Sequence, residues 1–200
     1  EATPEQRGLI FSFYETPARI ARKAAGVGLR LAEQIEAGSV EVLWQSLTDT
    51  LLDDIGYRLL GAVRRRGVQR LFVDGIDAIE QSSIYPGRLA PFLAALANAL
   101  RDEGVTTIFT SEIPQLVGGE AEIAFGAVSA VAENIMLLRY VELEASLRRV
   151  FSLVKVRESD FDASVRELSI TAQGLQLKPL PAPMEGLLTG HMTRYPSSVV

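Results

Sequence analysis

An aspartate and a glycine follow a short apolar run in the first half of the chain. The run is Leu71–Val73, and Asp74 and Gly75 come directly after it. A short apolar segment closed by turn residues is typical of a strand in a parallel sheet that is covered on both faces. Ligands of open α/β sheets bind at the carboxyl ends of such strands. An acid there could hold Mg²⁺ through its water shell, or orient a water molecule that attacks a phosphate.

A second acid, Glu15, stands after Tyr14 at the end of another predicted strand, Gly8–Phe13. A threonine and a proline come next and supply an N-cap and a first helical residue, so a helix is predicted over residues 17–25. Glu15 therefore has two interpretations. It is either a catalytic or water-orienting acid, or an acid that the dipole of the following helix stabilises.

Composition excludes several classes of site. The chain contains no cysteine, which excludes disulfides, thiolate catalysis and cysteine-based zinc sites, and its one histidine, His191, lies near the C-terminus. The net charge of −5 gives no basic field for nucleic acid or an anionic membrane. No apolar stretch approaches the roughly 20 residues of a membrane-spanning helix, and the first residues do not have the pattern of a signal peptide. A cytoplasmic location is the expectation.

The spacing of apolar residues predicts alternating strands and helices first, and strands alone from residue 134 onward. The predicted helices span residues 17–25, 29–36, 48–66 and 86–103, and the predicted strands span residues 8–13, 40–44, 70–74, 106–111, 134–140, 148–156, 165–170 and 175–177. A loop is expected over residues 112–125. This order predicts an α/β fold in which a parallel sheet, covered by helices, is extended at one edge by antiparallel strands.

Several segments resemble, in order, motifs of the KaiC-like ATPases of the RecA superfamily. They are residues 10–17, 71–76, 107–112, 131–140, 154–159, 165–171, 174–175 and 185–190. Each motif is weak by itself, and the assignment depends on their order and spacing. The resemblance implies a RecA-like three-layer core, with a mostly parallel sheet and an antiparallel C-terminal extension, over residues 1–178, and an extended C-terminal tail over residues 179–200.

The resemblance also implies a ligand, ATP with Mg²⁺, and residues that bind it. Asp74 matches the Walker B acid, which binds the nucleotide through the metal ion. Lys155 and Arg157 match residues that reach the nucleotide of a neighbouring subunit. Glu15 matches the second of two adjacent acids, and Tyr14 replaces the first, which resembles the activator of the attacking water. A homo-oligomer, in the form of a hexameric ring, and protein signalling partners are implied for the intact protein.

Four departures from the family pattern concern the reaction itself. No P-loop sequence, G-x-x-x-x-G-K-[ST], occurs among the 200 residues, and we expect it to precede Glu1 in a longer protein. The phenol of Tyr14 is mostly protonated at neutral pH and is therefore a poor base. Gly75 stands where the family commonly has serine, and Glu158 stands where it has glycine, beside Arg157. We expect the 200-residue chain not to hydrolyse ATP by itself.

Three functions are compatible with these residues. The first is an ATP-binding domain of a clock, signalling or DNA-linked protein. The second is a degenerate, non-catalytic module for oligomerisation or regulation, which the departures favour. The third is a receiver-like domain with Asp74 as phosphoacceptor, which fits poorly because it requires paired acids after the first strand. Glu112 fits a sensor-like residue or a plain loop acid, and Lys155 and Arg157 also fit a half-exposed strand, because they alternate with valines.

Overall fold

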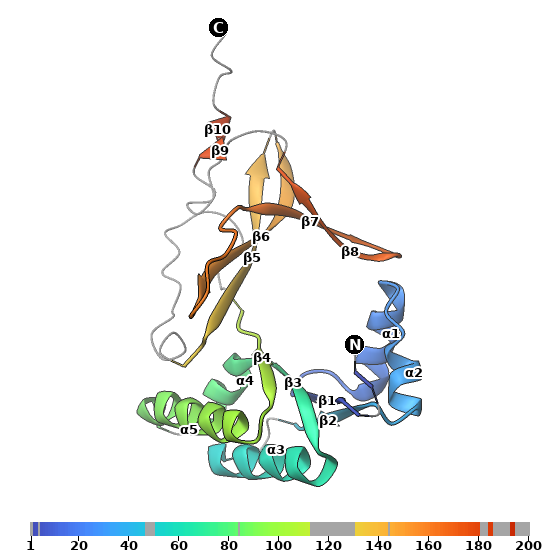
Figure 1. Ribbon diagram of the computed structural model, residues 1–200, viewed down its shortest axis with the longest axis vertical. Coiled ribbons are helices and arrows are strands. Elements are labelled where there is room, and N and C mark those ends of the chain that lie inside the picture. Colours follow the sequence, from blue (N-terminus) through green and yellow to red (C-terminus); the bar gives the residue numbers. More distant parts are fainter. Residues whose placement is uncertain are drawn as a thin grey trace, which may run out of the picture. The chain divides into compact units, whose positions relative to one another are not determined.

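The computed structural model describes residues 2–3, 5–46, 51–83, 85–112, 131–143, 145–180, 184–185 and 193–194. The chain divides into two compact units, Glu1–Glu112 and Ile113–Val200 (Figure 1). His191, the predicted helix start at residues 48–49, nearly all of the predicted loop and most of the predicted tail lie outside the described residues.

A parallel sheet forms the centre of the first unit. Its strands are β1 (Arg7–Ser12), β2 (Val40–Trp44), β3 (Val68–Asp74) and β4 (Thr106–Phe109), in the order β2-β1-β3-β4. Ser12 is the register partner of both Trp44 and Asp74. The carboxyl ends of β1, β2 and β3 therefore lie level at one edge of the sheet, where open α/β sheets bind ligands.

The helices of this unit follow the strands in the predicted alternation. They are α1 (Pro17–Gly26), α2 (Leu31–Glu36), α3 (Leu52–Arg66), α4 (Ile76–Gln81) and α5 (Leu89–Asp102), with a 3-10 turn, η1 (Pro86–Arg88), before α5. α3 and α5 lie side by side against the sheet, while α1 and α2 contact each other and β2 (Figure 1). None of the helices within the described ranges is long and apolar enough to span a membrane.

Apolar side chains of α3, α5 and the two central strands make the core. The residues buried to at least 95% include Leu9, Phe11, Ile55, Leu59, Val63, Leu71, Val73, Leu93, Leu96 and Leu100. Side chains on the opposite face of the strands are less buried in the described part of the chain. Phe72 is half-buried and Ile108 is 46% exposed. The prediction of a mostly parallel, RecA-like α/β sheet is confirmed, although cover over both faces of β3 is incomplete among the described residues.

The second unit is an antiparallel sheet in the order β5-β6-β7-β8. Its strands are β5 (Asn134–Leu143), β6 (Ser146–Val156), β7 (Arg166–Thr171) and β8 (Gly174–Pro179), and two short strands, β9 (Met184–Glu185) and β10 (Thr193–Arg194), pair with each other. The antiparallel C-terminal extension is therefore confirmed. Strands β5–β8 form a sheet of their own, in which each pairs with the next along the chain, so the prediction that they continue the edge of the parallel sheet was wrong for the described residues.

Candidate functional site

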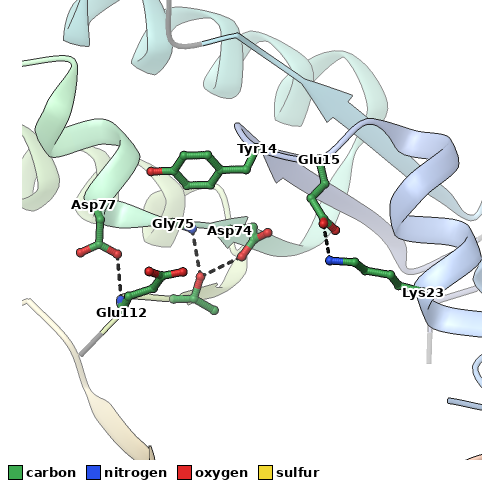
Figure 2. A pocket seen from close by; sticks show the side chains of 8 residues that line it. Tyr14, Glu15, Lys23, Asp74, Gly75, Asp77 and Glu112 are labelled. Carbon is green, nitrogen blue, oxygen red and sulfur yellow. Dashed lines mark hydrogen bonds and ion pairs between the residues drawn. The ribbon is translucent and has the colours of Figure 1, made fainter. Parts of the chain in front are cut away.

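A pocket of about 270 Å³ opens at the carboxyl ends of the parallel strands (Figure 2). Its lining consists of Tyr14, Glu15, Lys23, Asp74, Gly75, Asp77, Thr110 and Glu112. The structure thus brings together two of the predicted site residues, Glu15 and Asp74. The ring of Tyr14 lies on the side of these residues that faces α4 (Figure 2). Four carboxylates and one ammonium give the pocket an acidic balance.

Hydrogen bonds from three sides fix the end of β1. The buried Ser12 accepts the N–H of Gln45 at its carbonyl oxygen, at 3.0 Å, and the N–H of Glu15 at its hydroxyl oxygen, at 3.3 Å. The indole N–H of Trp44 donates to the carbonyl oxygen of Phe13 at 3.0 Å. The backbone that carries Tyr14 and Glu15 is therefore held against β2, while the Tyr14 ring extends toward Asp77 and the Glu15 carboxylate toward Lys23 (Figure 2).

Thr110 holds Asp74 in place at the end of β3. Its hydroxyl donates to Oδ1 of Asp74 at 3.1 Å and accepts the N–H of Gly75 at 2.9 Å. Backbone hydrogen bonds from Thr110 to Val73, at 3.1 Å, and from Ile76 to Thr110, at 2.8 Å, extend the pairing of β3 and β4 beyond their last strand residues. The second carboxylate oxygen of Asp74 makes no hydrogen bond or ion pair with any residue that the structure describes.

Gly75 lets Tyr14 lie close to the end of β3. Its φ of +101° is in the left-handed region, and a Cβ atom built on it would stand 3.2 Å from Cε2 of Tyr14. A serine at position 75 would therefore need both a strained backbone and a displaced ring. The two departures from the family pattern, Tyr14 and Gly75, are thus in contact with each other.

The phenol of Tyr14 stays neutral at physiological pH. Burial raises its pKa, and the negative charges of Asp77, Glu112 and Asp74 raise it further, while a hydrogen bond with Gln81 opposes them. In Figure 2 the ring extends from the end of β1 toward Asp77. A phenol in this setting can donate a hydrogen bond but cannot take a proton from water, as the sequence predicted.

Two cationic side chains of α1 interact with the carboxylate of Glu15. Lys23 makes an ion pair with its Oε1 atom (Figure 2), and Arg19 stands 3.9 Å from the same oxygen. Only 18% of the Glu15 side chain is exposed. The sequence analysis missed Lys23, whose only signal is that Arg19 and Lys23 are four residues apart on α1 and Glu15 precedes Arg19 by the same interval.

Asp77 ties the end of β4 to α4. Its Oδ1 accepts the hydroxyl of Ser111 at 3.0 Å, and its Oδ2 accepts the N–H of Glu112 at 2.8 Å. Sequence reasoning did not single out Asp77, because it read the residues after Asp74 as a turn. Glu112 was left open between a sensor-like residue and a loop acid, and the structure places its side chain in the lining of the pocket.

Comparison with known proteins decides the family. The family model for the KaiC ATPase matches residues 2–182. The chain belongs to the KaiC ATPase family. It is 29% identical to the circadian clock protein KaiC3 of a Synechocystis strain, over 92% of this chain and 36% of that protein. It is 24% identical to the circadian clock oscillator protein KaiC of Thermostichus vulcanus, over 94% of this chain and 36% of that protein. The chain therefore spans about a third of the length of these relatives.

The other predicted KaiC-family site residues belong to the second unit. Lys155 is half-buried in β6 and pairs in register with Ile135, and the exposed Arg157 follows the last residue of that strand. The backbone N–H of Arg157 donates to the carbonyl oxygen of Glu133 at 2.9 Å. Glu158 stands where the family has glycine. Its φ of +69° lies in the left-handed region, which favours glycine.

The donor set of the pocket fits the metal ion of an ATPase of this family. Carboxylate and hydroxyl oxygens are hard ligands of the kind that Mg²⁺ prefers. In the described part of the chain, no three acidic or histidine side chains converge closely enough to hold a metal ion by themselves.

Proposed function

We propose that this KaiC-family domain binds Mg²⁺-ATP within a longer protein, with Asp74 as the acid that holds the metal ion through its water shell. The observation that carries the proposal is the position of Asp74, fixed by Thr110 at the end of β3 with one oxygen directed to no other described residue. The P-loop of the longer protein supplies the phosphate contacts. The ion neutralises phosphate charge that the acidic pocket would otherwise repel.

We expect hydrolysis to be slow at this site. The attacking water needs a group that accepts its proton or orients it. Tyr14 stands at the position of the first family acid and stays protonated, because its pKa is raised. Glu15 is the remaining acid, and in this structure its carboxylate pairs with Lys23.

The assembly of the longer protein is part of the same proposal. Residues 1–178 act as one ATPase domain of a homo-oligomeric, hexameric ring, which the family match over residues 2–182 supports. Lys155 and Arg157 approach the nucleotide of a neighbouring subunit, and Glu158 weakens that approach because its carboxylate repels phosphate. Clock or signalling partners are proposed by analogy with the relatives.

Calorimetry with Mg²⁺-ATP tests the proposal. The full-length protein is expected to bind, and the 200-residue chain is expected to bind more weakly or not at all. Asp74→Asn in the full-length protein should weaken binding about tenfold or more, because the metal ion loses its charged ligand. Asp102→Asn, at the exposed end of α5, is the matched control and should change the affinity less than twofold.

A second function is favoured by one specific observation. Tyr14 packs against Gly75 at the mouth of the site, in place of an acid and a serine that the family commonly has. A non-catalytic module for assembly or regulation would tolerate that change. Absence of nucleotide binding by the full-length protein, with its oligomeric state intact in sedimentation, would favour this second function over the first.

A further inference from the structure

Lys23 is the one cationic side chain among the described residues that line the pocket. It lies on α1, and its ammonium group pairs with Oε1 of Glu15 (Figure 2). Arg19, one turn earlier, stands 3.9 Å from the same oxygen but does not line the pocket. An anion that enters the pocket would therefore meet Lys23 before any other positive charge that the structure describes.

The ion pair between Lys23 and Glu15 can give way to an ion pair between Lys23 and another anion. The Lys23 side chain is 64% exposed, so water screens its ammonium group, and Arg19 remains 3.9 Å from the less exposed Glu15 carboxylate. A terminal phosphate carries more charge than a carboxylate and offers three acceptor oxygens. It would compete well for an ammonium at the end of a flexible lysine side chain.

We propose that Lys23 changes partners when nucleotide binds, and this inference rests on the proposed function. In the free protein Lys23 neutralises Glu15. In the complex it contacts the terminal phosphate and leaves Glu15 as a charged carboxylate that can orient water. Lys23 is thus a phosphate-binding residue that also positions Glu15, and it favours a nucleoside triphosphate over the diphosphate.

A double-mutant cycle in the full-length protein tests the exchange, with affinity for Mg²⁺-ATP measured by calorimetry. Glu15→Gln should strengthen binding about two- to fivefold, because Lys23 no longer has to leave a carboxylate. Lys23→Ala should weaken binding about three- to tenfold, and should weaken Mg²⁺-ADP binding less. In the double variant, Glu15→Gln should give no gain.

The control is Arg22→Ala, which removes the same charge from the exposed neighbouring position on α1, outside the pocket. It should leave the gain from Glu15→Gln unchanged. If that gain persists in the Lys23→Ala protein, Glu15 acts only by its charge and the exchange is overturned. If the unaltered protein binds no nucleotide, the proposed function fails and this inference fails with it. Binding without coupling between the two positions overturns this inference alone.

Discussion

Gly75 has to satisfy two constraints, its own backbone conformation and the ring of Tyr14. Its φ is +101°, and an added Cβ would stand 3.2 Å from Cε2 of Tyr14. We expect Gly75→Ser to lower the free energy of unfolding by about 1–3 kcal/mol, because the side chain strains the backbone and displaces the ring. Urea denaturation followed by circular dichroism measures the change.

The contact and the backbone strain can be separated with one further substitution. In a Tyr14→Ala background, Gly75→Ser should cost less than in the unaltered protein, but it should still cost something, because φ remains positive. Gly26→Ser is the matched control, since nothing lies within 4 Å of an added Cβ there, and it should change stability by less than about 0.5 kcal/mol. An equal cost of Gly75→Ser in both backgrounds would show that the ring contributes nothing.

The ionisation of Tyr14 gives a pH-dependent signal from the site. Partial burial raises the pKa of Tyr14, which is 51% exposed, and the nearby carboxylates raise it further. We expect Tyr14 to lose its proton above the ordinary pH range of a tyrosine, about 10, in a titration followed by ring-carbon NMR. The unfolded chain loses the phenol proton first, at pH about 10. The contribution of Tyr14 to the free energy of unfolding is therefore full below that pH and falls as the pH rises toward the folded pKa.

Tyr14→Phe provides the check on this assignment, because it removes the titrating group and keeps the ring. The variant should show a weaker fall in stability above pH about 10 than the unaltered protein. Ionisation of Tyr14 at the ordinary pH of a tyrosine, about 10, would contradict the argument, since it would mean that the carboxylates do not act on the phenol.

At the scale of elements, one threonine within β4 and another directly after it have opposite roles. Thr110, directly after the strand, has its hydroxyl in hydrogen bonds with Asp74 and Gly75. The hydroxyl of Thr107 is buried and has no hydrogen-bond partner among the described residues. We expect Thr110→Val to lower the free energy of unfolding by about 1–3 kcal/mol, because it leaves a backbone N–H without a partner. Thr107→Val should be neutral or stabilising, because a methyl group needs no partner.

The same substitution at two positions of one segment makes each threonine the control for the other. Thermal and urea denaturation of both variants measure the two changes. If both substitutions destabilise equally, loss of β-branched packing or a general effect on β4 would explain them, and the hydrogen bonds at Asp74 would not. A loss of Mg²⁺-ATP affinity in Thr110→Val alone would connect the same hydroxyl with the site.

Elements with strong periodicity were predictable from the sequence. The predicted strand at residues 40–44 is β2, and the helix that ends at Arg66 is α3, because apolar spacing and the following Gly67 define them. α4 was not predicted, since it begins after an Asp-Gly pair that is typical of a turn.

The candidate site was predictable in part. Glu15 and Asp74 stand at strand ends, so their meeting at one edge of the sheet follows from the parallel order of the strands. The pair of Lys23 with Glu15 depends on where α1 leaves the strand and on the rotamers of two long side chains, which sequence does not specify. The separate antiparallel sheet depends on which strands pair, and this is decided by tertiary contacts.

At the scale of the whole molecule, the parallel sheet has an edge strand, β4, with unpaired backbone groups among the described residues. In the described part of the chain, β4 pairs with β3 on one side and with no strand on the other. Ile108 of this edge strand is 46% exposed. Unpaired N–H and C=O groups beside an exposed apolar side chain are a template for pairing with another chain. β7, in contrast, lies between β6 and β8 in its own sheet.

We therefore expect the 200-residue chain, expressed by itself, to self-associate through β4. Ile108→Lys should shift the population toward monomer in sedimentation velocity, because a lysine on an edge strand opposes pairing. Ile170→Lys on β7 is the matched control, since Ile170 is 45% exposed but lies in the antiparallel sheet, where it pairs in register with Leu175 of β8, and it should leave the association unchanged. If Ile170→Lys dissociates the chain and Ile108→Lys does not, the exposed face of the antiparallel sheet, and not the edge of the parallel one, joins the copies.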